Sequence, residues 1–203
     1  MFDTKETLTI TIASGETKSC VVRRPTDEEW ATRSRQCRIV RQSIGRGKTR
    51  TVPTNHDKPD LTLLAAIRQD KDGVELDAAE AGEVLTRLDY STVTNVETEP
   101  GGFTFRLAVE DTVDPMETVH RLRMPTAKQR LDHSRRSMLL ENDGRFSETR
   151  VMLEPSAALY DALLISAEGY VGGIVPINHK FTVIFELIDV VEQLQREYTR
   201  PEA

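Results

Sequence analysis

Two stretches, RRPTDEEW (23–30) and LRMPTAKQ (122–129), decide the fold that this sequence predicts. In each, a proline precedes a threonine, and a glutamate or glutamine follows three residues after that threonine. This pattern is a capping box, in which side chains and backbone at the start of a helix satisfy each other's hydrogen bonds. Thr26 and Thr126 are therefore predicted to mark the two points at which strands give way to a helix.

Alternating runs typical of strands precede each capping box. LTITIA (8–13) and SCVVRR (19–24) are separated by a short turn and predict a β-hairpin. Before the second box, runs at 92–96, 103–109 and 118–124 predict a meander, with Glu-Pro-Gly-Gly as its first turn.

The spacing of apolar residues predicts which face of each capped helix is buried. After Thr26, the apolar positions recur at helical spacing as far as Ile44, and Gly45 is expected to end the helix. After Thr126 the same spacing recurs. The predicted buried faces are Trp30, Cys37, Val40 and Ile44 in the first helix, and Ala127, Leu131, Ser134 and Met138 in the second.

Two further helices are predicted after each capped helix. In the first half they are 60–69 and the segment capped by Asp77, with Ala81, Leu85 and Leu88 facing inward. In the second half they are 155–169 and 179–198, the latter with one side formed by Phe181, Phe185, Ile188 and Val191. Because this last helix is apolar over more than one face, it is predicted to be either a central core helix or a second interface, over 181–194, with another subunit.

The order of these elements, together with sequence identities, predicts an internal duplication. Shifted by 100 positions, residues 23–50 and 123–150 share seven identities, among them Ser34 with Ser134 and Arg35 with Arg135. We therefore expect an α+β fold of two related halves, 1–90 and 91–203, each a hairpin or meander followed by a capped basic helix and two helices.

Composition indicates a globular protein without membrane segments. Of the 203 residues, 38% are apolar and 30% charged, and no apolar run approaches the length of a membrane span. The start has no signal-peptide pattern. We expect the chain to be made and kept in a cytosol, or released with something assembled there, with Cys20 and Cys37 as reduced structural thiols.

The net charge of −6 conceals a basic segment, because residues 23–50 hold nine Lys/Arg and three acids. Docking on an acidic surface of a neighbouring subunit is the favoured interpretation. Phosphate contacts to nucleic acid and a solvated helix face stay open as alternatives, although the segment lacks stacking aromatics. The predicted partner-binding patch consists of Arg33, Arg35, Arg38, Arg41, Arg46, Lys48 and Arg50.

Several stretches match known functional motifs only in part. QSIGRGKT (42–49) ends like a phosphate-binding loop but has Gln42 where the first glycine is required, and no helix is predicted to follow. Asp70, Asp72 and Gly73 match only part of a calcium loop. The histidines lack ligand spacing, and no hydrolase or metalloprotease motif occurs. We expect no catalytic residue, metal or cofactor.

RRPTDEEWATRSRQCRIVRQ (23–42), the Asp-Lys-Asp-Gly turn, LRMPTAKQRLDHSRR (122–136) and ALYDALL (158–164) together resemble small proteins encoded in the tail gene module of tailed bacteriophages. The resemblance implies a non-enzymatic virion component or tail assembly factor, present in several copies and bound to other tail proteins. It carries no site residues.

Overall fold

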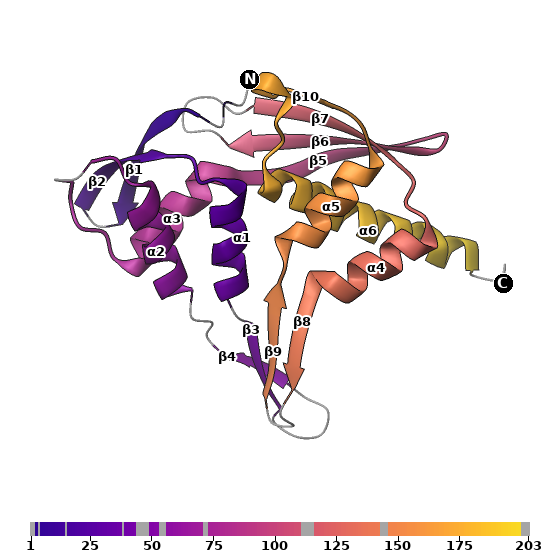
Figure 1. Ribbon diagram of the computed structural model, residues 1–203, viewed down its shortest axis with the longest axis horizontal. Helices are drawn as coiled ribbons and strands as arrows, with labels where there is room; N and C mark the ends of the chain where they lie inside the picture. The colour runs from indigo at the N-terminus through magenta and orange to yellow at the C-terminus, as the bar shows by residue number, and fades with distance from the viewer. Residues whose placement is uncertain are drawn as a thin grey trace.

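The computed structural model describes residues 3, 5–14, 16–37, 39–43, 49–52, 56–70, 73–110, 116–142 and 146–199 (Figure 1). The α+β class is confirmed. In chain order the elements are β1 (Thr7–Ser14), β2 (Glu16–Arg23), α1 (Asp27–Gln36), β3 (Ile39–Ser43), β4 (Thr49–Val52), α2 (Asp57–Ile67), α3 (Ala78–Asp89), β5 (Tyr90–Glu99), β6 (Gly102–Glu110), β7 (Met116–Arg123), α4 (Ala127–Ser137), β8 (Met138–Asn142), β9 (Phe146–Val151), α5 (Leu153–Leu163), β10 (Leu164–Glu168), the short 3₁₀ helix η1 (Val171–Gly173) and α6 (Ile177–Thr199).

The described strands form three antiparallel sheets. β1 pairs with β2, a four-stranded sheet has the order β10-β7-β6-β5, and a second four-stranded sheet has the order β4-β3-β9-β8. In Figure 1 the helices lie between the two four-stranded sheets, and β4-β3-β9-β8 extends away from the rest of the molecule. This last sheet joins a hairpin from each predicted half.

The first buried cluster lies under the β1-β2 hairpin. Alternate residues of β1 and β2 face α2 and α3, as the period of two in the sequence predicts. Residues from the second half complete this cluster: Leu153, Ile177, Ala157 and Phe181 pack against it. The core of the first half is therefore closed by residues that come more than sixty positions later in the chain.

The second cluster lies between the sheet β10-β7-β6-β5 and helices α5 and α6. Phe105, Leu107 and Leu122 from the sheet and Ile184 and Leu187 from α6 are fully buried. On the side of α6 that the sequence analysis singled out, Val191 is buried but Phe185 is 63% exposed. The helix turns Val183, Ile184 and Leu187 toward the sheet instead, so Phe185 points the other way.

The prediction of one helix from Thr26 to Ile44 is wrong beyond Gln36. Cys37 has extended backbone angles (φ −73°, ψ 132°), and Ile39–Ser43 forms β3 between β4 and β9. The β-branched pair Ile39-Val40 suits a strand, and Val40 lies opposite Val52 and Glu148 in the sheet. Ile44 lies outside the described residues.

The sequence analysis also missed β4, β8, β9 and β10. The predicted helix at 155–169 ends at Leu163, and Leu164–Glu168 pairs with β7 as β10. These strands are four to six residues long. They are too short to show a clear alternating pattern, and their partners come from distant parts of the chain.

Part of the order of elements occurs twice, and the internal duplication itself stays a prediction. β1-β2-α1-β3-β4-α2-α3 corresponds to β6-β7-α4-β8-β9-α5-α6. β10 also has a counterpart: Leu164 pairs with Leu122, and in the first half a single bridge joins Arg68 to Val22. β5, which follows α3 without a gap, has none among the described strands.

The hairpin registers locate the equivalent positions of the two halves. Val40 lies opposite Val52, and Leu140 lies opposite Thr149. If Leu140 corresponds to Val40, then Thr149 corresponds to Val52. Thr49 and Thr149, which are identical at the offset of 100, are therefore not at equivalent positions of the two hairpins, and the same holds for Arg50 and Arg150.

Candidate interaction surface

The N-terminus of α1 is held by the predicted capping box. Thr26 Oγ1 accepts a hydrogen bond from the Glu29 backbone N–H at 3.3 Å, and the Glu29 carboxylate accepts one from the Thr26 N–H at 2.8 Å. Arg23 donates to both oxygens of Glu29 at 2.7 and 2.8 Å. These hydrogen bonds, that of Arg23 first, lower the pKa of Glu29 to about 2. β2 and α1 are thereby fixed to each other.

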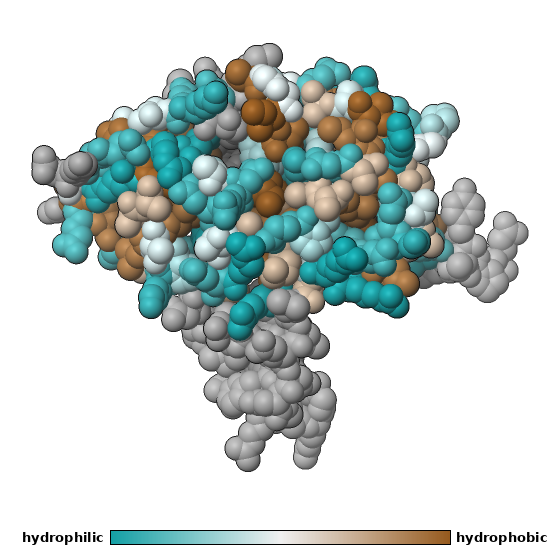
Figure 2. All heavy atoms as spheres, in the orientation of Figure 1, coloured by the Kyte–Doolittle hydropathy of each residue, from teal (hydrophilic) through white to brown (hydrophobic). Residues whose placement is uncertain are grey.

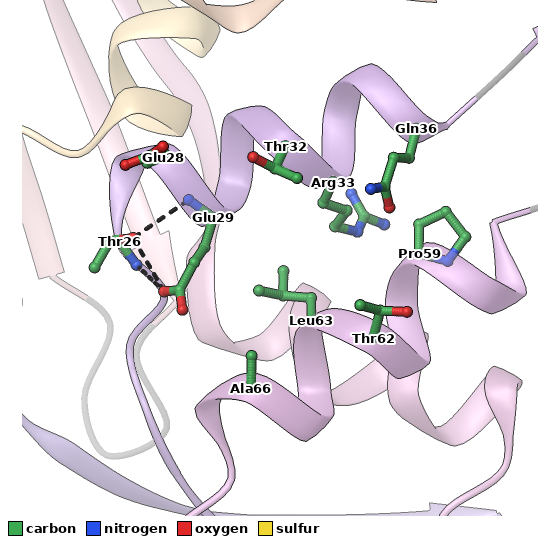
Figure 3. A pocket seen from close by; sticks show the side chains of 10 residues that line it. All are labelled: Thr26, Glu28, Glu29, Thr32, Arg33, Gln36, Pro59, Thr62, Leu63 and Ala66. Carbon is green, nitrogen blue, oxygen red and sulfur yellow. Dashed lines mark hydrogen bonds between the residues drawn. The ribbon is translucent and has the colours of Figure 1, made fainter.

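A groove of about 440 Å³ lies between α1 and α2 (Figure 3). Two of its charged side chains have partners within the protein, since Glu29 binds Arg23 and Arg33 Nε donates to Asp60 Oδ1 at 2.6 Å. Asp60 is buried. The groove is formed by Thr26, Glu28, Glu29, Thr32, Arg33 and Gln36 on one side and by Pro59, Thr62, Leu63 and Ala66 on the other.

One face of α1, which we term the cross-half face, binds the second half of the molecule. Asp27 Oδ1 accepts a hydrogen bond from the Ile177 N–H at 2.9 Å, and Ser34 Oγ donates to the Val151 carbonyl at 2.7 Å. Arg35 forms an ion pair with Glu154. Between them Ala31 is only 3% exposed. The cross-half face consists of Asp27, Ala31, Ser34 and Arg35.

The equivalent face of α4 is uncovered. The sequence predicted that Ala127, Leu131, Ser134 and Met138 are buried, but all four are exposed, with Leu131 at 51% and Met138 at 55%. α4 packs on α5 through another side, where His133 Nε2 and Ser156 Oγ lie 2.9 Å apart. We term Ala127, Leu131, Ser134 and Arg135, together with Met138 at the start of β8, the open face of α4.

The predicted basic patch is not one helical surface. Arg33 and Arg35 lie on α1 and bind Asp60 and Glu154. Arg41 lies in β3 and Arg50 in β4, opposite Thr51 and Gln42 respectively. Arg38, Arg46 and Lys48 lie outside the described residues. The four described members therefore divide between α1 and the β3-β4 hairpin.

The described residues of the two motif-like stretches have partners within the protein. Gln42 and Thr49 belong to the antiparallel strands β3 and β4, so QSIGRGKT crosses a hairpin rather than leading from a strand into a helix. Asp70 is held by Arg68 Nε at 2.7 Å and closes a turn with the Gly73 N–H at 3.2 Å. Asp72 lies outside the described residues.

A buried polar cluster, missed by the sequence analysis as a group, lies between β7, α5 and α6. His120 Nδ1 lies 2.6 Å from the Tyr160 hydroxyl, and His120 Nε2 lies 3.0 Å from Thr118 Oγ1 and from the Tyr170 hydroxyl. Tyr170 also contacts His179 Nδ1 at 2.9 Å. Burial lowers the pKa of His120 to about 3 and raises that of Tyr160. Thr118 and His120 alternate along β7, which is the signal that they share a face.

The described residues contain no group of three or more His, Cys, Asp or Glu side chains placed to hold a metal. Across the same part of the chain, no helix combines the length and apolar character needed to cross a bilayer. Cys20 and Cys37 are free thiols, and burial raises the pKa of each.

Comparison with protein-family models, with curated proteins and with solved structures gives no match. The proposed function therefore rests on the sequence and structure of this chain.

Proposed function

We propose that this protein is a non-enzymatic structural or assembly protein of a tailed-phage virion, in the tail region, that acts through protein–protein contacts in several copies. The open face of α4 carries this proposal, since Leu131 and Met138 are more than half exposed there. Apolar side chains at helical spacing on a surface are typical of a docking site. The phage tail as the setting rests on the sequence resemblance.

The surface around this face suits docking more than a chemical reaction. On the side seen in Figure 2, apolar atoms form separate areas among hydrophilic ones. Beside the open face, Met124 and Val191 contribute to a hollow of about 670 Å³ with Arg130, Glu192 and Arg196 around it. A mixed apolar and charged surface of this kind is typical of protein–protein interfaces.

The nucleic-acid alternative has less support, because two arginines of the predicted patch already bind carboxylates and Trp30 is buried. A gel shift that disappears as salt is raised would favour that alternative over a protein partner.

Charge reversal of the basic segment tests the proposal. We expect a variant carrying Glu at four basic positions to retain its helical circular dichroism but to associate at least tenfold more weakly with the tail proteins encoded beside it. Size-exclusion chromatography of co-expressed proteins measures the association. The reversed residues are Arg38, Arg41, Arg46 and Lys48.

The matched control reverses four exposed basic residues elsewhere: Lys5, Arg87, Arg121 and Arg123. It carries the same change in net charge and should associate normally. Equal binding by both variants would remove the basic segment from the interface. Failure of the unmodified protein to bind any tail protein would overturn the proposed function.

A further inference from the structure

We infer that copies of this chain associate head to tail, with the second half of one copy docking on the first half of the next. The junction between copies repeats the junction between the two halves of a single chain. This inference rests on the proposed multi-copy role and names the partner surface within it.

The first observation is the order of strands in the sheet β4-β3-β9-β8. Its central junction is the antiparallel pair β3 and β9, and its free edges are β4 and β8. By element order β8 is the counterpart of β3, and β4 is the counterpart of β9. Pairing β8 with β4 of the next copy therefore reproduces the β3-β9 junction in the same antiparallel sense.

The internal register fixes which residues meet. Ile39 lies opposite Thr149 within the chain, and their counterparts are Leu139 and Val52. The junction between copies consequently places Leu139 opposite Val52, Leu140 opposite Thr51, Glu141 opposite Arg50 and Asn142 opposite Thr49. An acidic and a basic residue at one register position favour this pairing, since opposite charges across antiparallel strands attract.

The second observation is independent of the strands and concerns the helices. The open face of α4 is the counterpart of the cross-half face of α1. Ser134 and Arg135 repeat Ser34 and Arg35, which bind the second half within the chain. Within one chain the second half covers this face of α1, and no further half among the described residues covers the same face of α4. A second copy of the chain would cover it.

The receiving surface on the next copy follows from the same correspondence. Matching the buried residues of α2 with α5 and of α3 with α6 makes Leu61 the counterpart of Ala157, and Ala78 the counterpart of Ile177. Leu61 is exposed. Where Ala31 and Ile177 belong to the junction within the chain, Leu131 and Ala78 belong to the junction between copies. The larger side chain of Leu131 offsets the smaller side chain of Ala78, so the total volume is similar.

One contact changes in kind. The counterpart of Glu154 is Lys58, and the adjacent carboxylate is that of Asp57, which is exposed. The ion pair that Arg35 forms with Glu154 within the chain therefore has no direct counterpart at the junction between copies.

The two surfaces of this junction differ, so the contact is heterologous. Such a contact closes into a ring if the rotation between copies divides a full turn, and otherwise builds an open filament. Association also pairs β4 and β8, the two strands at the ends of the described sheet β4-β3-β9-β8, and edge strands are prone to pair with other strands.

Cross-linking of mixed proteins that each carry one introduced cysteine tests the register, because the native Cys20 is buried. In a Cys37→Ser background, Leu140→Cys on one protein and Thr51→Cys on a differently tagged protein should be joined by a short bismaleimide. Thr9→Cys, on the exposed side of β1, is the matched control. The expected product links position 140 to position 51. Products linking 140 to 140 or 51 to 51 as the main species, or no product above the Thr9→Cys level, would overturn the inference.

Sedimentation velocity over a concentration series tests the helical contact. Leu131→Asp places a charge in the open face and should raise the dissociation constant of self-association at least tenfold. Ile174→Asp, at a position 55% exposed between η1 and α6, should leave it unchanged. Circular dichroism checks that both variants fold. Equal association of the two variants would exclude the open face from the junction.

These outcomes separate the inference from the proposed function. A protein that stays monomeric at about 100 μM and gives no cross-link, yet binds tail proteins, overturns only the head-to-tail junction. A protein that self-associates but binds no tail protein overturns only the proposed function.

Discussion

His120 is a histidine that the fold keeps neutral. Its two ring nitrogens contact three hydroxyl groups, and the side chain is completely buried. Burial, with a smaller effect of the charge of His179, lowers its pKa from 6.5 to about 3. A proton on this ring would be buried against hydroxyl groups, which carry no negative charge to stabilise it.

The low pKa of His120 makes stability depend on pH. Because the pKa in the folded protein lies below the value of 6.5 in the unfolded chain, the contribution of His120 is complete above pH 6.5 and is lost as the pH falls toward 3. We expect the free energy of unfolding to fall by about 1 kcal/mol more per pH unit in the unmodified protein than in His120→Gln between these limits.

Urea denaturation at a series of pH values measures this difference in slope. Other groups that titrate in the same range, such as Glu29, contribute equally to both proteins. Parallel pH profiles for the two proteins would show that His120 is protonated in the folded state.

At the scale of the element, the two capping boxes have the same geometry. Thr126 Oγ1 accepts a hydrogen bond from the Gln129 N–H at 3.2 Å, and the Gln129 side chain accepts one from the Thr126 N–H at 2.9 Å. Thr26 and Glu29 do the same at the start of α1. Both helix starts were predicted from the sequence because a capping box is a local pattern.

Removing either cap should cost a similar amount of stability. We expect Thr26→Ala and Thr126→Ala each to lower the free energy of unfolding by about 1 kcal/mol, since each leaves a backbone N–H without its acceptor. Thr86→Ala, on the exposed surface of α3, should change it by less than about 0.5 kcal/mol. Urea midpoints measure all three variants, and a cap variant no weaker than Thr86→Ala would contradict the prediction.

The elements that the sequence did not predict depend on distant partners. β3 is a strand because β9, more than one hundred residues later, pairs with one side of it. The local sequence of residues 37–44 does not indicate this pairing, because Val40 fits the apolar spacing of a helix as well as that of a strand. The identity of the basic residues was visible in the sequence, but their division between α1 and the β3-β4 hairpin follows from the end of the helix at Gln36.

Burial of a helix face was predictable only as apolar character. The spacing of Leu131 and Met138 indicates an apolar face, and it does not say whether the covering surface lies in the same chain. In the structure this face is open. The sequence therefore predicted the apolar residues of the candidate interface. Only the structure shows that they are exposed and so available to a partner.

At the scale of the whole molecule, the two buried clusters are joined across the predicted halves. Leu153 and Ile177 belong to the cluster under β1 and β2, although their helices also build the other cluster. Loss of structure in one half consequently uncovers apolar surface in the other.

This connection predicts cooperative unfolding. Trp30 is the single tryptophan and lies in the first cluster, so its fluorescence reports on the first half. We expect the fluorescence and far-ultraviolet circular dichroism transitions in urea to coincide. Leu153→Ala should move both together and cost about 2–3 kcal/mol. A fluorescence transition separate from the circular dichroism transition would show that the halves unfold independently.

The closure of the first cluster by Ile177 and Phe181 also sets a timing for folding during synthesis. At roughly 5–20 residues per second, translation needs about 5–20 s to proceed from the end of α3 to these residues. During that interval the newly made first half presents Trp30 and Ala31 without their final cover. A chaperone that binds nascent chains is therefore needed most by this protein in the middle of its translation, and the need ends when α6 emerges.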